Sequence, residues 1–99
     1  MPRIRTHPGE VLKQEFMAPL ALSANRLAIE LAVPATRIGE IIKADNPRAV
    51  SADTAIRHGR YFGTTPDFWM NLQAAHDLSK AQAEKGREIA SRVQPRETA

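Results

Sequence analysis

Residues 23–43 read SANRLAIELAVPATRIGEIIK, and this stretch decides the fold because it holds two short helical patterns separated by a proline. Ser23 is a suitable N-cap, since its hydroxyl can accept a hydrogen bond from the N–H groups of a first helical turn. Pro34 cannot continue that helix, but it is well placed to start another. Apolar side chains recur at helical spacing on both sides of it: Leu27, Ala28 and Leu31, then Ile38, Ile41 and Ile42. We therefore expect two short helices joined by a tight break.

The second of these segments carries polar side chains between its apolar positions. Thr36, Arg37, Glu40 and Lys43 stand there, and they are long enough to reach a partner. Two short helices, with the small Ala28 where they must approach and a polar outer face on the second, favour a helix-turn-helix. An ordinary helical hairpin in a small bundle is the alternative interpretation.

The chain has 99 residues, no cysteine and a formal net charge of +3. This length suits one domain, and a chain of this size buries only about 60–70% of its extended surface, so dimerisation would stabilise it. The absence of cysteine excludes disulfides and thiolate metal sites and suits the cytosol. We expect no signal peptide and no membrane span, because no apolar run approaches the roughly 18 residues that a span needs. The positive charge favours an anionic partner such as nucleic acid.

Three further helices are predicted outside residues 23–43. The first begins near Pro8, with Thr6 or His7 at its N-cap, and ends near Met17. The fourth is capped by Ser51 and ends at Gly63. Its inward face should carry Ala55, His58, Gly59 and Phe62. The last is capped by Thr65, and its buried side should carry Phe68, Trp69, Leu72, Ala75 and Leu78.

The chain divides into three predicted parts. Residues 1–6, with two arginines, are expected to be a flexible basic arm, and residues 7–79 the helix-turn-helix domain. Residues 80–99 are expected to be a C-terminal helical extension, weakened by Gly86, and a disordered tail.

No pattern in the sequence indicates catalysis. The three histidines, His7, His58 and His76, fall on different predicted elements, and neither a metal-binding spacing nor a glycine-rich phosphate loop is present. We therefore expect no enzyme activity, no metal site and no cofactor. His58 is expected to be a core residue with a hydrogen-bonded ring, and His76 to be exposed or at an interface.

The candidate DNA-binding residues follow from how a helix-turn-helix docks, with the N-terminal part of its second helix in the major groove. Base edges or flanking phosphates would be reached by Ala35, Thr36, Arg37, Glu40 and Lys43. Phosphate contacts would come from Ser23, Asn25, Arg26 and Arg48. The alternative for Arg37 and Glu40 is a surface ion pair, which contributes little to stability.

Two stretches, HPGEVLKQEFMAPLALSANRLAIELAVPATRIGEII and SADTAIRHGRYFGTTPDFWMNLQAAHDL, resemble the HigA-type antitoxins, also described as virulence-associated protein I relatives. These belong to the phage-repressor-like (Xre) helix-turn-helix group. The match covers about residues 7–79, and HPGE and TTPDFWMNLQAAHDL are its most specific parts.

The resemblance implies an all-α, five-helix, lambda-repressor-like helix-turn-helix domain with a C-terminal helical extension. It also implies a cytoplasmic, nucleoid-associated homodimer that binds double-stranded operator DNA to repress its own operon, and that neutralises a HigB-type, mRNA-cleaving toxin. Family dimers pair through the last helix, which implies an interface at Phe68, Trp69 and Leu72. An intramolecular core is the alternative for these three residues.

The sequence departs from the family pattern within the helix-turn-helix. Ala24 stands where the family usually has a glutamine, and Gly39 where it often has a polar residue. His58 replaces a customary leucine. These departures motivate one alternative, a protein-interaction module that inhibits a toxin and binds DNA weakly. A solitary helix-turn-helix regulator without a toxin is the other.

Overall fold

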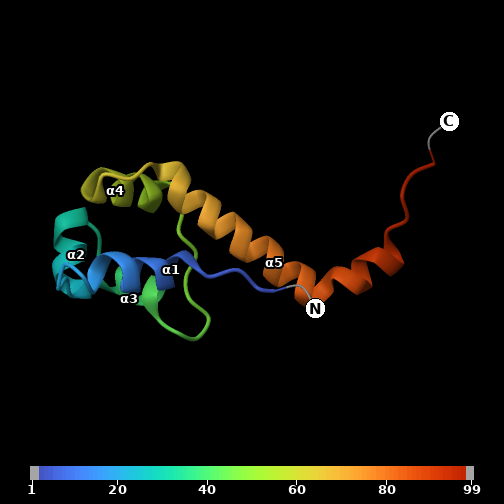
Figure 1. Ribbon diagram of the computed structural model, residues 1–99, viewed down its shortest axis with the longest axis horizontal. Coiled ribbons are helices and arrows are strands. Elements are labelled where there is room, and N and C mark those ends of the chain that lie inside the picture. Colours follow the sequence, from blue (N-terminus) through green and yellow to red (C-terminus); the bar gives the residue numbers. More distant parts are fainter. Residues whose placement is uncertain (1–2, 98–99) are drawn as a thin grey trace.

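The computed structural model describes residues 3–97, and within that range the regular structure is entirely helical. The elements are α1 (Pro8–Val11), the wider turns of η1 (Leu12–Met17), α2 (Ala24–Leu31), α3 (Ala35–Ile42), α4 (Ala52–Phe62) and α5 (Pro66–Arg92). Because η1 continues α1 without a break, the described chain has five helices, and the all-α, five-helix prediction is confirmed. Figure 1 shows the first four gathered at one end of the molecule, while the second half of α5 projects away from them.

Hydroxyl caps fix where three of the helices begin. The hydroxyls of Ser23, Ser51 and Thr65 accept hydrogen bonds from backbone N–H groups in the first turns of α2, α4 and α5. At the other end of α4, Gly63 takes the left-handed conformation (φ 75°) that favours glycine. Pro34 differs by one position from its prediction: it is the N-cap of α3, in extended conformation, and not the first residue of the helix.

The first helix is not the regular α-helix that the sequence predicts. The N–H of Ala18 donates to the Lys13 carbonyl (3.0 Å), a hydrogen bond that spans five residues and defines π-type turns. Such turns place residues five apart on one face, and Leu12 and Met17 are indeed both buried. The wider turn therefore brings Met17 into the core, and Phe16 packs partly buried against it.

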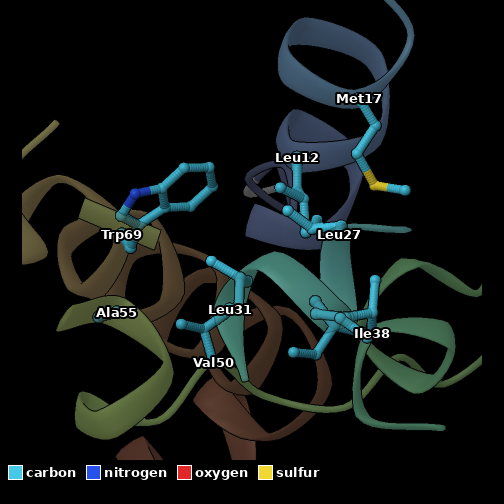
Figure 2. Packing of buried hydrophobic residues seen from close by; sticks show 10 residues of the cluster. Leu12, Met17, Leu27, Leu31, Ile38, Val50, Ala55 and Trp69 are labelled. Carbon is cyan, nitrogen blue, oxygen red and sulfur yellow. The ribbon is translucent and has the colours of Figure 1, made fainter. Parts of the chain in front are cut away.

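The hydrophobic core draws side chains from every helix (Figure 2). Its buried apolar members are Leu12, Met17, Leu27, Ala28, Leu31, Ile38, Ile41, Val50, Ala55 and Trp69. The inward-facing apolar residues predicted for α2 and α3 are among them, with Ile42 partly buried. Trp69 is fully buried, and its indole N–H donates to Thr64 Oγ1 (2.8 Å), so the polar atom of this large side chain is satisfied.

Gly9 allows α1 to pack directly on the C-terminal end of α3. A Cβ atom at this position would overlap the carbonyl oxygen of Ile41 and would lie 2.8 Å from its carbonyl carbon. The adjacent His7 caps the helix, because its ring Nδ1 accepts from the Gly9 N–H (2.8 Å). The HPG sequence at residues 7–9 thus fixes both the start of α1 and its distance from α3.

The buried side of α5 is more polar than its apolar spacing predicts. Phe68 and Leu78, expected inside, are 39% and 62% exposed, whereas Gln73 and Ser79 are buried. The physical reason is that this side of α5 faces backbone groups that need partners. Gln73 Oε1 accepts from the N–H of Val50 (2.8 Å) in the link between α3 and α4.

The N-terminal segment contacts two further polar residues of α5, His76 and Ser79. The Arg5 N–H donates to Ser79 Oγ (2.8 Å), and the Arg5 carbonyl lies 2.7 Å from the His76 ring Nδ1. Arg5 is therefore anchored on α5, which differs from the expected flexible arm; Met1 and Pro2 lie outside the described residues. The expected disordered tail has no regular structure over residues 93–97, and residues 98–99 are also outside the described range.

Candidate nucleic-acid interface

The outer face of α3 is a polar surface of the helix pair. Ile38 and Ile41 are buried and hold one side of the helix against the core. The opposite side presents the predicted residues Ala35, Thr36, Glu40 and Lys43, all exposed, with Arg37 half-buried at its edge. Four of these five predicted residues therefore lie on one short helix, and Lys43 is the C-cap that follows it.

Arg37 does not pair with Glu40, which was the alternative raised by the sequence. Its Nη1 lies 3.5 Å from Asp53 Oδ1, in the first turn of α4. Glu40 instead accepts from Arg48 Nη1 (2.9 Å), and the backbone N–H of Arg48 donates to the Glu40 carbonyl (2.8 Å). The link that follows α3 is therefore folded back on that helix, which places Arg48 beside it.

The residues predicted at the start of α2 are also exposed. Ser23, Asn25 and Arg26 lie there together, with the Ser23 hydroxyl capping the helix through the Arg26 N–H (3.0 Å). The Arg26 guanidinium forms an ion pair with Glu30 one turn along (2.8 Å). Ala24 is half-buried and offers only a methyl group at its position.

Asp53 and Arg57 belong to this surface and were missed by the sequence analysis. Arg57 Nε donates to Asp53 Oδ1 (2.7 Å), and Arg57 Nη1 donates to the carbonyls of Leu31 (2.8 Å) and Ala32 (3.3 Å) at the end of α2. Their spacing of four residues in a predicted helix is a signal for an ion pair. No local pattern connects Arg57 to α2, which lies more than twenty residues earlier in the chain.

The electrostatics of this cluster keep Asp53 ionised. The hydrogen bond from Arg57 lowers the pKa of the Asp53 carboxyl, and the charges of Arg57 and Arg37 act in the same direction. Two arginines therefore share one carboxylate, and the cluster keeps a net positive charge.

The last helix only partly matches the predicted dimer interface. Trp69 has no exposed surface, so its side chain belongs to the core of the protomer, the alternative that the sequence left open. Phe68 is 39% exposed and lies edge-on to Trp69, with the ring centroids 5.1 Å apart, and Leu72 is half-buried. Only Phe68 and Leu72 of the three keep surface on which a partner can pack.

The histidines are arranged differently from the prediction. His58 is completely buried, as expected, but neither ring nitrogen has a hydrogen-bond partner among residues 3–97. Its ring lies against Trp69 (4.8 Å between centroids), and burial lowers its pKa to about 4. His7 and His76, far apart in sequence, meet edge-on at 4.9 Å. Burial lowers the pKa of His7, as does the nearby His76, while Asp77 raises it.

Across residues 3–97, no group of three or more His, Asp or Glu side chains is arranged to hold a metal ion. In the same range, every helix is too short or too polar to cross a membrane.

Comparisons with known proteins were made by sequence and by structure, and no protein-family model matches the sequence. Virulence-associated protein I of Dichelobacter nodosus is 46% identical over 85 residues, which cover 86% of this chain and 75% of that protein. The solved structure of the Pseudomonas aeruginosa antitoxin HigA with the higBA promoter is 42% identical, with a TM-score of 0.86 over 94% of this chain and 98% of that one. The antitoxin GraA in complex with its operator is 38% identical, with a TM-score of 0.90 over 99% of this chain and 97% of that one.

Proposed function

Because the chain belongs to the family of HigA-type antitoxins and virulence-associated protein I relatives, we propose that it binds operator DNA through α3 and represses its own operon as a homodimer. We further propose that it neutralises a HigB-type, mRNA-cleaving toxin in the cytoplasm and has no enzyme activity of its own. The observation that carries the DNA-binding part is the exposed polar face of α3, held rigid by the buried Ile38 and Ile41.

Charge supports DNA as the partner of this face. Arg26, Arg37, Lys43 and Arg48 all lie on the helix-turn-helix or the link that follows it. Two relatives of 38–42% identity were solved with operator or promoter DNA. A protein surface with several cations and few competing apolar groups binds the phosphate backbone and steers it toward the reading helix.

The proposed contacts follow from the chemistry of each side chain. We infer that Thr36 packs its methyl on a thymine methyl and that Arg37 donates two hydrogen bonds to guanine O6 and N7; both side chains retain exposed surface. Glu40 can accept from cytosine N4 once Arg48 turns to a phosphate. The small side chain of Ala35 allows the DNA to approach the start of α3 closely. Phosphate contacts come from the remaining predicted residues, Ser23, Asn25, Arg26, Lys43 and Arg48.

Binding of the DNA upstream of the chain's own reading frame tests the proposal. Fluorescence anisotropy should show tighter binding to that duplex than to a scrambled duplex of equal length. Lys43→Ala should weaken both and reduce the slope of log K against log salt by about 1, because one phosphate contact is lost. Lys85→Ala is the matched control, since Lys85 is exposed on the projecting part of α5. Equal affinity of the wild-type protein for the two duplexes at physiological salt would contradict sequence-specific binding.

Dimerisation and toxin binding need their own measurements. A two-fold dimer should place its two α3 helices about 34 Å apart, one turn of B-DNA. Light scattering should then give twice the chain mass for the free protein, and twice the chain mass plus the mass of the duplex for the complex. One chain in both states contradicts this part. Co-expression with the small reading frame beside the gene should yield a complex without ribonuclease activity. If no such reading frame exists, the chain is a solitary regulator.

A second candidate function is supported by the composition of the same face. Gly39 contributes no side chain, and the acidic Glu40 and Asp53 lie where DNA phosphates would approach. These features fit a chain whose main task is to bind and inhibit a toxin. A tight toxin complex together with no operator shift at physiological salt would favour this function over the first.

A further inference from the structure

Asp53 and Arg57 of α4 connect three helices beside the proposed reading helix. Asp53 Oδ1, in the first turn of α4, accepts from Arg57 Nε at 2.7 Å and lies 3.5 Å from Nη1 of Arg37 on α3. Arg57 also donates to the carbonyls of Leu31 and Ala32 at the end of α2. Both helices of the helix-turn-helix are thus tied to α4 through this one pair of residues.

Arg57 gives the Asp53 carboxylate a fixed position. The last carbonyls of a helix lack partners within that helix, and here a guanidinium fills that role. Since the planar guanidinium donates to two carbonyls and one carboxylate at once, its orientation is determined by three acceptors. Asp53 is therefore held by a donor that is itself immobilised, although its side chain faces solvent.

The contact with Asp53 matters for Arg37 because an arginine side chain has many rotamers. A free guanidinium samples several directions and loses that freedom when it pairs with a base. The Arg37 guanidinium lies on the side of α3 that faces the start of α4, with its Nη1 3.5 Å from the Asp53 oxygen.

We propose that Asp53 is a positioning residue for sequence readout: it orients the Arg37 guanidinium and so sets the base preference of α3. The inference rests on the proposed function, since it requires that α3 reads DNA. Asp53 does not contact a base; it acts through Arg37, and Arg57 in turn holds Asp53.

Two simpler roles for Asp53 make different predictions. As a helix N-terminal acid it would only stabilise α4, and Asp53→Asn would then lower the melting temperature without changing base preference. As a negative charge near DNA it would only repel phosphates, and Asp53→Asn would then tighten binding to all duplexes by the same factor. Of the three roles, only positioning predicts a change in the ratio between the affinity for the operator and the affinity for a scrambled duplex.

The test compares affinities for an operator and for its scrambled form. The operator is first selected with wild-type protein from a library of random duplexes of roughly 30 base pairs, about three helical turns. The specificity ratio, the operator affinity divided by the scrambled affinity, is then measured for each variant. We expect Asp53→Asn to lower this ratio about tenfold, and Asp53→Glu, which keeps the carboxylate, to retain most of it.

Asp67→Asn is the matched control. Asp67 is the second residue of α5, as Asp53 is of α4, so the same charge is removed from the same helical position away from α3. Its ratio should equal that of the wild type. In an Arg37→Ala background, Asp53→Asn should change the ratio less than about twofold, because the residue through which it acts is absent.

The outcomes separate the inference from the function on which it rests. If the wild-type protein selects no operator, both the proposed DNA readout and this inference fail. If it selects one and Asp53→Asn keeps the wild-type ratio, the inference alone is wrong. It is also wrong if Asp53→Asn lowers the ratio equally with and without Arg37. Melting temperatures recorded beside each ratio show that a lowered value comes from folded protein.

Discussion

The contact between α1 and α3 can be tested with the same substitution at two glycines. Gly9→Ala introduces a Cβ atom that overlaps the Ile41 carbonyl oxygen and lies 3.0 Å from the His7 ring Nδ1. Gly39→Ala introduces one that, apart from its own helix and neighbours, meets no atom of the described chain within 4 Å. Since both positions are helical, the two variants share any gain in helix propensity and differ in packing.

The two substitutions should change the free energy of unfolding in opposite directions. Overpacking costs about 1–3 kcal/mol and sometimes more, and the clash at Gly9 involves backbone that no rotamer change relieves. We expect a net loss of about 2–3 kcal/mol, which lowers the melting temperature by about 10–20 °C in a domain of this size. Gly39→Ala should raise the unfolding free energy by about 0.5–1 kcal/mol, because alanine restricts the unfolded chain and favours the helix.

Chemical denaturation followed by circular dichroism measures both changes, and an unchanged m-value shows that the same surface is exposed on unfolding. A loss below about 1 kcal/mol at Gly9 would show that α1 can separate from α3 without penalty. The explanation given for the glycine of HPG would then be wrong. A destabilised Gly39→Ala variant would refute the claim that this side of α3 is open.

Three further predictions concern buried or helix-end polar groups. Between pH 4, near the pKa of His58 in the folded chain, and its ordinary pKa of 6.5, the unfolded chain binds more protons than the folded one, so the free energy of unfolding should fall by up to about 3 kcal/mol as the pH drops through this window. In denaturation titrations at several pH values, His58→Leu should remove most of this pH dependence, and His7, whose pKa is also lowered, should account for the remainder. Arg57→Ala should cost about 1–2 kcal/mol by leaving the α2 carbonyls without their donor, and Arg57→Lys should recover only part of it in the same assay. Gln73→Leu should cost about 1–3 kcal/mol and speed hydrogen exchange at the Val50 amide, which loses its buried acceptor; unchanged protection there would contradict the assigned bond.

Much of the fold is predictable because its determinants are local. Ser23, Ser51 and Thr65 each cap a helix through a hydroxyl and an N–H three residues away, so sequence spacing alone identifies them. The apolar stripes of α2 and α3 are equally local. Since the apolar stripe of α3 faces the core, the opposite side of that helix is predicted to be exposed.

The remainder depends on partners that are distant in the chain. Gln73 is 23 residues from Val50, and Ser79 is 74 residues from Arg5, so neither pairing leaves a local pattern. The apolar spacing of α5 predicted apolar residues on its inner side, because periodicity does not register the backbone groups which that side must satisfy. For the same reason the sequence identified Arg37 as exposed and polar but not Asp53 as its partner.

Two of the ion pairs beside α3, Glu40–Arg48 and Asp53–Arg57, differ in how easily they can be exchanged for DNA contacts. Glu40 and Arg48 are each about half-exposed, and an exposed pair contributes only about 0–1 kcal/mol, so a phosphate can replace Glu40 as the partner of Arg48. That exchange frees both members at once, the arginine for a phosphate and the carboxylate for a cytosine amino group. Arg57 cannot be exchanged in the same way, because leaving Asp53 would also disturb its bonds to the end of α2. Under the proposed function, the face therefore combines one pair that opens on binding with one that stays closed, and the closed pair is the one that contacts Arg37.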